Sequence, residues 1–150
     1  MVPLLMVETD QVRDDIFAEI NFHTSYEPAR CVRTGRYKYI RYYDTSYLKI
    51  NRSNIDESLT KDHFMERGLD EQKKEEEALY DLVYDPGERR NLAKDPEHER
   101  ILLDMRARLE YYEKKTADPI QDGPIPIRPQ WKVNRRACQK ASSKDPKDYV

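Results

Sequence analysis

The chain has 150 residues, a length that suits one domain and is short for two. Its 27 Lys and Arg against 29 Asp and Glu give a net charge of −2, which excludes a protein that binds nucleic acid through an overall basic charge. Hydrophobic residues make up 37% of the chain, below the roughly 45–50% of ordinary globular domains, so we expect a small core. The 11 tyrosines nevertheless supply aromatic surface that a disordered polar chain lacks.

Cysteine and histidine are sparse and scattered. The two cysteines, Cys31 and Cys138, lie far apart, and the spacing of the three histidines shows neither a disulfide framework nor a metal site. The apolar run at residues 1–7 is interrupted by Pro3 and lacks the features of a signal peptide. It is also too short to span a membrane, which takes ~20 apolar residues. We therefore expect no membrane partner and no metal site in this chain, which resembles the middle of a longer protein; its localisation stays open.

The first structural prediction is a small antiparallel sheet. Residues 16–22 alternate apolar and polar side chains and predict a strand. Pro28 lacks the N–H group that a strand needs, so we expect it to end this segment, with the next strand at residues 30–34. Residues 37–43 are rich in aromatic side chains, which suit a pleated surface. A turn at Thr34, Gly35 and Arg36 predicts a hairpin between them.

Between residues 44 and 77 the pattern weakens and predicts a loop excursion with one or two short helices, broken at Gly68. The charged run at residues 71–77 is typical of a solvated helix end. Residues 78–83 predict a further strand. It is followed by the turn residues Asp85, Pro86 and Gly87, in which we expect glycine to supply the positive φ.

The strongest helix prediction covers residues 95–114. Asp95 suits the N-cap and Pro96 the first turn. Apolar residues recur at steps of three and four, while Arg106 is expected on the surface; the stripe comprises Ile101, Leu102, Met105, Leu109 and Tyr112. Such a stripe must be covered, so we predict an α+β fold in which one long helix packs on a sheet of about four antiparallel strands.

Beyond Asp118 the prolines exclude helix and central strand and predict an extended tail. Residues 128–150 hold seven Lys or Arg and two Asp, a net charge of +5. We expect this tail to lie on the acidic body of its own chain, because five net charges make a weak footprint for nucleic acid. The chain thus divides into residues 1–118 and a tail at 119–150, with no nucleic-acid partner expected.

No catalytic constellation emerges from the residues. Cys31 precedes Arg36 by five positions in a strand-like run, which excludes a phosphatase loop and favours a buried thiol. Acidic groups such as 14–15 and 75–77 are expected as surface charges. His23 stands at a strand end near Glu27 and Arg30, where it either faces a ligand or is satisfied by hydrogen bonds at the rim of the sheet.

Several segments resemble the C-terminal part of sulfatases. Residues 79–82 (LYDL), 85–88 (DPGE) and 91–92 (NL) are similar to the sulfatase pattern LYDL…DPxExxNL, and residues 30–34 (RCVRT) and 36–40 (RYKYI) to the strands before it. Residues 2–5 with Glu8 resemble LxPLLxGE at the end of the catalytic domain, with Val7 in place of glycine. The resemblance runs from residue 1 to about residue 118 and is strongest to the heparan N-sulfatase (N-sulfoglucosamine sulfohydrolase) branch. Residues 118–126 are similar to its DPxxDGPxP ending.

This resemblance implies a C-terminal subdomain that docks on a sulfatase catalytic domain and helps to bind a sulfated carbohydrate. The formylglycine, matured from C/S-x-P-x-R, and the calcium ion are implied for the full-length parent only, since neither cysteine here has that context. The chain is then expected to be inactive alone, with no catalytic residue. Candidate substrate-binding residues are His23 and Glu27, supported by Arg30, while residues 85–88 are expected to be structural. The alternative is a free-standing, non-catalytic interaction module.

Overall fold

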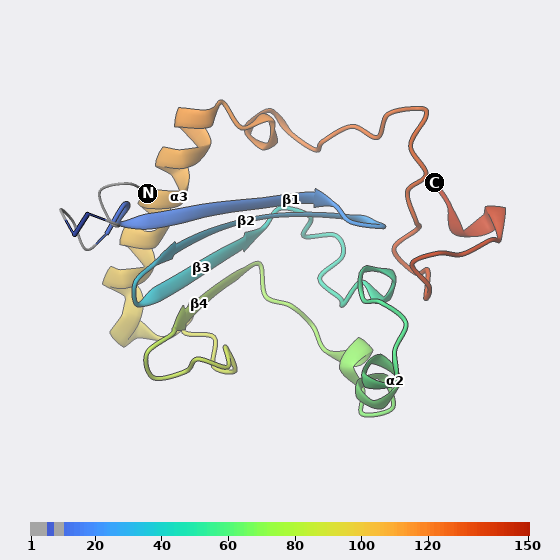
Figure 1. Ribbon diagram of the computed structural model, residues 1–150, viewed down its shortest axis with the longest axis horizontal. Coiled ribbons are helices and arrows are strands. Elements are labelled where there is room, and N and C mark those ends of the chain that lie inside the picture. The colour runs from blue at the N-terminus through green and yellow to red at the C-terminus, as the bar shows by residue number, and fades with distance from the viewer. Residues whose placement is uncertain (1–5, 8–10) are drawn as a thin grey trace.

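The computed structural model describes residues 6–7 and 11–150, so most of the apolar run at residues 1–7 lies outside the described residues. A four-stranded antiparallel sheet forms the centre, its strands adjacent in chain order: β1 (Asp15–Phe22), β2 (Tyr26–Thr34), β3 (Tyr37–Tyr42) and β4 (Glu77–Asp81). One long helix, α3 (Glu99–Thr116), crosses one face of this sheet (Figure 1). The predicted α+β class is therefore confirmed.

The hairpin between β2 and β3 is confirmed at the expected place. Arg33 lies opposite Lys38, and Gly35 and Arg36 alone separate the two strands. The Arg36 guanidinium donates to Asp81 at the end of β4, with Nη2 to Oδ2 at 2.7 Å. One ion pair therefore joins this hairpin turn to the end of the fourth strand.

Pro28 lies inside β2, and the prediction that it separates two strands is wrong. The pairing of β1 with β2 shifts between Ile20, opposite Ala29, and Phe22, opposite Tyr26, so β2 carries one residue more than β1 across this interval. Pro28 falls in that bulge, where the ladder does not need its missing N–H group. Its carbonyl still accepts from the backbone N–H of Tyr43 at 3.0 Å.

The excursion between β3 and β4 contains the expected short helices. These are the 3₁₀ helix η1 (Arg52–Asn54), the helix α2 (Leu59–Met65) and the 3₁₀ helix η2 (Leu69–Glu71). Gly68 separates the last two with a φ of 78°, which a residue without Cβ adopts readily. The charged run is not a helix end, because η2 ends at Glu71 and Glu77 already begins β4.

The turn after β4 is stabilised by the side chain of Asp85 and does not depend on a positive φ at Gly87. The Asp85 carboxylate accepts from the backbone N–H groups of Arg89 and Arg90, at 2.7 and 2.8 Å. The positive φ expected at Gly87 belongs instead to Glu88, at 52°. Glu88 forms an ion pair with Lys38, 2.7 Å apart, which fixes the turn to the sheet. Val7, where the sulfatase pattern has glycine, likewise has a left-handed φ of 58°.

Asn91 and Leu92 pack along the outer edge of β4. The Asn91 side chain accepts from the Leu79 N–H and donates to the Glu77 carbonyl, both at 2.9 Å. It thereby pairs backbone groups that an edge strand leaves free. Leu92 enters the core beside it. These contacts give the segment at residues 85–92 a structural role.

The apolar stripe of α3 is buried as predicted. The predicted start at Asp95 is that of a short 3₁₀ helix, η3 (Pro96–His98), which Asp95 caps by accepting from the N–H of Glu97 at 3.1 Å, and α3 follows it from Glu99. Leu102, Met105 and Leu109 are 5%, 1% and 1% exposed. They pack on a row of side chains that lie next to one another across the four strands, namely Phe17, Val32, Tyr39 and Leu79.

Acidic residues that were expected on the surface hold α3 to the sheet. Glu77 accepts from Arg106, which was predicted to be a free surface residue, with Nε to Oε1 at 3.1 Å. The Tyr39 hydroxyl also donates to Glu77 at 2.5 Å. Burial acts to raise the pKa of Glu77, and the hydrogen bonds from Arg106 and Tyr39 outweigh it, so this pKa lies below its ordinary value. Asp15 accepts from Arg108 in the same way, at 3.0 Å.

The tail passes from the end of α3 along the sheet to its far end (Figure 1). It begins with the 3₁₀ helix η4 (Pro119–Asp122) and ends near the 3₁₀ helix η5 (Pro146–Asp148). Asn134 forms bridges with Ser25 and with Tyr149. Val133 and Cys138 are each 4% exposed, so parts of the tail are buried. The prediction that prolines exclude helix here is wrong for two short segments, because Pro119 and Pro146 each open a 3₁₀ helix, where a missing N–H group is tolerated. Among the residues described, no helix has the length and apolar character needed to cross a membrane.

Candidate functional site

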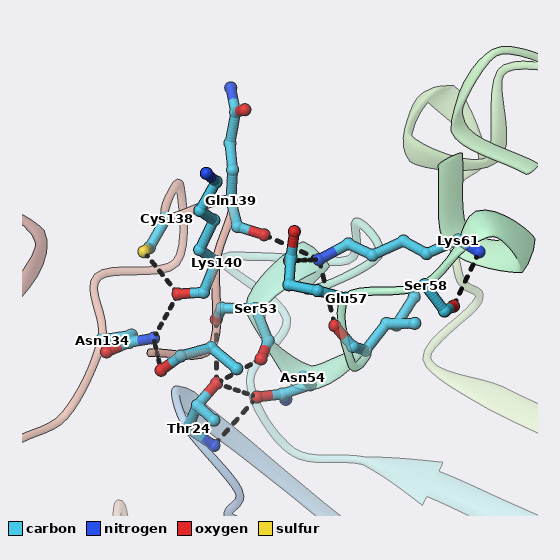
Figure 2. Close-up of polar contacts among 12 residues, drawn as sticks. Thr24, Ser53, Asn54, Glu57, Ser58, Lys61, Asn134, Cys138, Gln139 and Lys140 are labelled. Carbon is cyan, nitrogen blue, oxygen red and sulfur yellow. Dashed lines mark hydrogen bonds and ion pairs between the residues drawn. The ribbon is translucent and has the colours of Figure 1, made fainter. Parts of the chain in front are cut away.

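The connection from β1 to β2 is held rigidly by the side chain of Asn54. Its Oδ1 accepts from the backbone N–H groups of Thr24 and Ser25, both at 3.1 Å. The Thr24 hydroxyl donates to the carbonyl of Ser53 at 2.7 Å, and the Thr24 carbonyl accepts from the N–H of Asn134 in the tail. Figure 2 shows this meeting of Thr24, η1 and the tail. The loop that carries His23 therefore has a fixed shape.

Glu27 forms a half-buried network on this connection. It accepts from Nδ2 of Asn54 at 2.6 Å and forms an ion pair with Lys74. Burial acts to raise the pKa of Glu27, and hydrogen bonds from Lys74, Asn51 and Asn54 outweigh it and hold the pKa below its ordinary value. Glu27 is therefore an ionised carboxylate that joins the excursion to β2.

Arg30 is fully buried and paired with Asp118. Both side chains are 0% exposed, and the guanidinium donates from Nε and Nη2 to the two carboxylate oxygens at 2.5 and 2.8 Å. The Arg30 hydrogen bonds hold the pKa of Asp118 below its ordinary value. Nη1 of Arg30 donates to the carbonyls of Ile20 and Ala29, both at 3.0 Å. Every nitrogen of the guanidinium thus has a partner within the chain.

His23 differs from the other two candidates because it is exposed. Among the described residues, no hydrogen bond or ion pair joins His23, Glu27 and Arg30 to one another. Arg30 faces the end of α3, and Glu27 faces the excursion. The residues that orient this region, namely Asn54, Lys74 and Asp118, escape a sequence analysis because they come from distant segments. Asp118 alone carries a local signal, since it precedes Pro119 at a helix end.

A second polar cluster joins α2 to the tail. Lys61 is 6% exposed, and its ammonium donates to the carbonyls of Ile55 and Gln139, at 3.0 and 2.8 Å. It also pairs with Glu57 at 2.5 Å. Asn134 donates to the carbonyl of Lys140 at 3.1 Å. Figure 2 shows that these contacts surround backbone carbonyls, so the cluster serves to fix the tail.

The sheet face opposite α3 is an open apolar groove. It has a volume of about 440 Å³. Ile16 and Ile20 on this face are 51% and 39% exposed. In the pleat these positions alternate with the row that packs on α3. Six of its ten lining residues are small, apolar or aromatic, namely Ala18, Ile20, Ala29, Cys31, Ile40 and Tyr42, and the other four are charged, namely Glu19, Glu27, Arg30 and Lys38.

The two thiols differ from the expectation. Cys31 is only half-buried on the open face, whereas Cys138 in the tail is the buried one and donates to the carbonyl of Lys140 at 3.2 Å. Burial raises the pKa of Cys31, which suits a neutral thiol. Among residues 6–7 and 11–150, no group of three or more His, Cys, Asp or Glu side chains is arranged to hold a metal ion.

We expect a thiol reagent at neutral pH to modify Cys31 before Cys138 in the folded chain. The physical reason is access, because modification requires contact with the sulfur atom. Mass spectrometry of the two cysteine peptides over time measures both rates. Faster modification of Cys138 would contradict the placement of the tail.

No family model matches the chain. Two curated proteins are similar to it, and both are sulfatases. A Delta 4,5-hexuronate-2-O-sulfatase of Bacteroides thetaiotaomicron is 37% identical over 101 residues, which cover 65% of this chain and 15% of that protein. An ulvan-active sulfatase of Formosa agariphila is 37% identical over 83 residues, covering 52% and 16%. The chain therefore spans about one sixth of the length of these relatives.

The fold is also similar to that of a sulfatase among the solved structures. A 2-O GAG sulfatase superposes with a TM-score of 0.56 at 28% identity, over 87% of this chain and 22% of that one. The chain thus resembles part of sulfatases that act on sulfated sugars. The N-sulfatase branch is not among these relatives.

Proposed function

We propose that this chain is the C-terminal part of a sulfatase that acts on a sulfated sugar. The observation that carries the proposal is the likeness of 87% of the chain to about a fifth of a 2-O GAG sulfatase, in sequence and fold together. The two curated sulfatases support it, because each is matched over a similarly small share of its length.

The catalytic groups of such an enzyme are outside this chain. The resemblance implies a formylglycine from a C/S-x-P-x-R motif and a calcium ion, and the residues present do not fit either group. Cys31 lies in the middle of β2 and is followed by Val32 and Arg33, and Cys138 is buried in the tail. No cluster of metal ligands occurs in the part of the chain that the structure describes. We therefore derive no catalytic step from this chain.

The partner that we propose for the open sheet face is the catalytic domain of the same sulfatase. An antiparallel sheet that faces water on one side ordinarily carries polar residues there, whereas alanine, isoleucine, cysteine and tyrosine make up six of the ten residues that line this groove. An apolar patch of this kind marks an interaction surface. The relatives contain the large remaining part of a sulfatase that would cover it. In the assembled enzyme Cys31 is then protected from thiol reagents.

The sugar contact that we propose at the β1–β2 connection is made by His23. Its side chain is exposed on a loop that Asn54 holds in place. Glu27 and Arg30 support this loop through Lys74 and Asp118 instead of facing solvent. The substrate class is a sulfated carbohydrate. N-sulfoglucosamine, suggested by the N-sulfatase resemblance, and a 2-O-sulfated uronic acid, suggested by the relatives, are the two substrates to compare.

The chain alone is expected to release no sulfate. Without a nucleophile there is no reacting pair for binding to orient. The test incubates the purified chain and calcium with an aryl sulfate, with N-sulfoglucosamine and with a 2-O-sulfated disaccharide, and measures free sulfate beside a mock purification. Turnover above the mock that disappears in His23→Ala or Cys31→Ala would overturn the proposal and indicate an independent enzyme.

A further inference from the structure

A turn of the tail places an exposed tryptophan beside the β1–β2 connection. The N–H of Trp131 donates to the carbonyl of Arg128 at 2.9 Å, and the Trp131 ring packs edge-on against Phe22, with centroids 5.4 Å apart. Phe22 in turn contacts the ring of Tyr26 at 5.0 Å. Trp131 is 40% exposed. This group of rings, which we call the aromatic platform, comprises Phe22, Tyr26 and Trp131.

Two basic residues are held against aromatic rings at this turn. The Arg128 guanidinium lies over the Trp131 ring, 5.2 Å from its centroid, and the Lys132 ammonium lies 5.8 Å from the centroid of Tyr149. Both residues are exposed, and neither forms an ion pair with a carboxylate of the described chain. Several arginines of the body differ in this respect, because Arg30, Arg36, Arg106 and Arg108 each pair with an acidic residue.

Such an arrangement suits an anion on a ring-shaped molecule. A guanidinium carries five N–H donors in a planar fork, and two of these donors match two oxygens of a sulfate group. The apolar face of a sugar ring packs on exposed aromatic surface, since both lose contact with water. Arg128 and Lys132 have no acidic partner in the described chain, so their positive charges are available to an anionic ligand.

We propose that the aromatic platform with Arg128 and Lys132 is a contact surface for a sulfated sugar chain. The inference rests on the proposed function, which supplies the sulfated carbohydrate, and extends it to residues of the tail. His23 is next to Phe22 of this platform in the chain. It lies between Phe22, which packs on Trp131, and Thr24, whose carbonyl accepts from Asn134 of the tail.

Trp131 is the single tryptophan of the chain, so its fluorescence reports on this surface directly. The experiment titrates the chain with a heparin-derived oligosaccharide, with the same oligosaccharide after desulfation, with inorganic sulfate, and with a DNA oligonucleotide of equal charge. We expect a saturable change in Trp131 emission with the sulfated sugar alone. An equal response to DNA would overturn the sulfated-sugar assignment and indicate a general polyanion surface.

Matched variants then locate the contact by calorimetry. We expect Arg128→Ala and Lys132→Ala each to weaken binding of the sulfated oligosaccharide by about fivefold. Arg100→Ala, an exposed arginine on α3 with no ion pair in the described chain, should change it by less than about twofold. Equal binding by all three variants, or no binding by the parent chain, would overturn the inference. A different result would contradict the proposed function alone: sulfated sugar binds to this surface, but the gene encodes no sulfatase motif upstream.

Discussion

Replacing Asp118 by asparagine is expected to lower the free energy of unfolding by about 3–5 kcal/mol, since it leaves a buried guanidinium without its charge partner. Arg30 and Asp118 are both 0% exposed at their side chains and join through two hydrogen bonds across 88 residues of sequence. Urea denaturation of Asp118→Asn beside the parent chain measures the loss.

The matched control is Glu19→Gln, because Glu19 lies 3.7 Å from Arg30 but is 55% exposed. Surface ion pairs contribute about 0–1 kcal/mol, so this variant should remain close to the parent. An equal loss in both variants would contradict a dominant role for the buried pair.

The same pair predicts how stability depends on pH. Arg30 lowers the pKa of Asp118 in the folded chain, so the unfolded chain binds this proton more readily. The contribution of the pair is therefore complete above the unfolded pKa of about 3.9 and is lost as the pH falls through the lower folded value. We expect the parent chain to lose more stability than Asp118→Asn in acid. Parallel stability curves for the two would contradict this.

Replacing Leu109 by alanine is expected to cost about 2–5 kcal/mol, the range for a leucine removed from a packed core. Leu109 is 1% exposed at the centre of the contact between α3 and the sheet. Leu103→Ala is the matched control, because it makes the same chemical change on the same helix at a residue that is 54% exposed. That variant should lie within about 0.5 kcal/mol of the parent.

Thermal and urea unfolding of the two leucine variants decide this second prediction. Similar midpoints for Leu103→Ala and Leu109→Ala would show that α3 does not pack on the sheet through the stripe described. A selective loss in Leu109→Ala would agree with the structure.

The sheet and its helix were predictable because their signals are local. The alternation at residues 16–22, the turn at Gly35 and the periodic stripe of α3 each depend on near neighbours in sequence. The strand end predicted at Pro28 is wrong because a bulge in the pairing with β1 makes its missing N–H group harmless, and pairing register is a property of two strands.

The surroundings of the candidate site residues could not be predicted, because their partners are distant in the sequence. His23, Glu27 and Arg30 are neighbours in the sequence, but their surroundings depend on Asn54, Lys74 and Asp118 from three other segments. The half-buried position of Cys31 and the buried position of Cys138 likewise depend on which sheet face and which tail segment are covered. A basic tail alone does not indicate that Arg128 and Trp131 meet Phe22.

The reading frame that precedes the codon for Met1 tests the central claim most directly. The proposal that this chain is the C-terminal part of a sulfatase predicts an in-frame C/S-x-P-x-R motif upstream, within a sequence that continues into residue 1. A stop codon directly before Met1 with no such motif in the frame, or an upstream domain of another kind, would contradict the proposal. It would favour a free-standing interaction module.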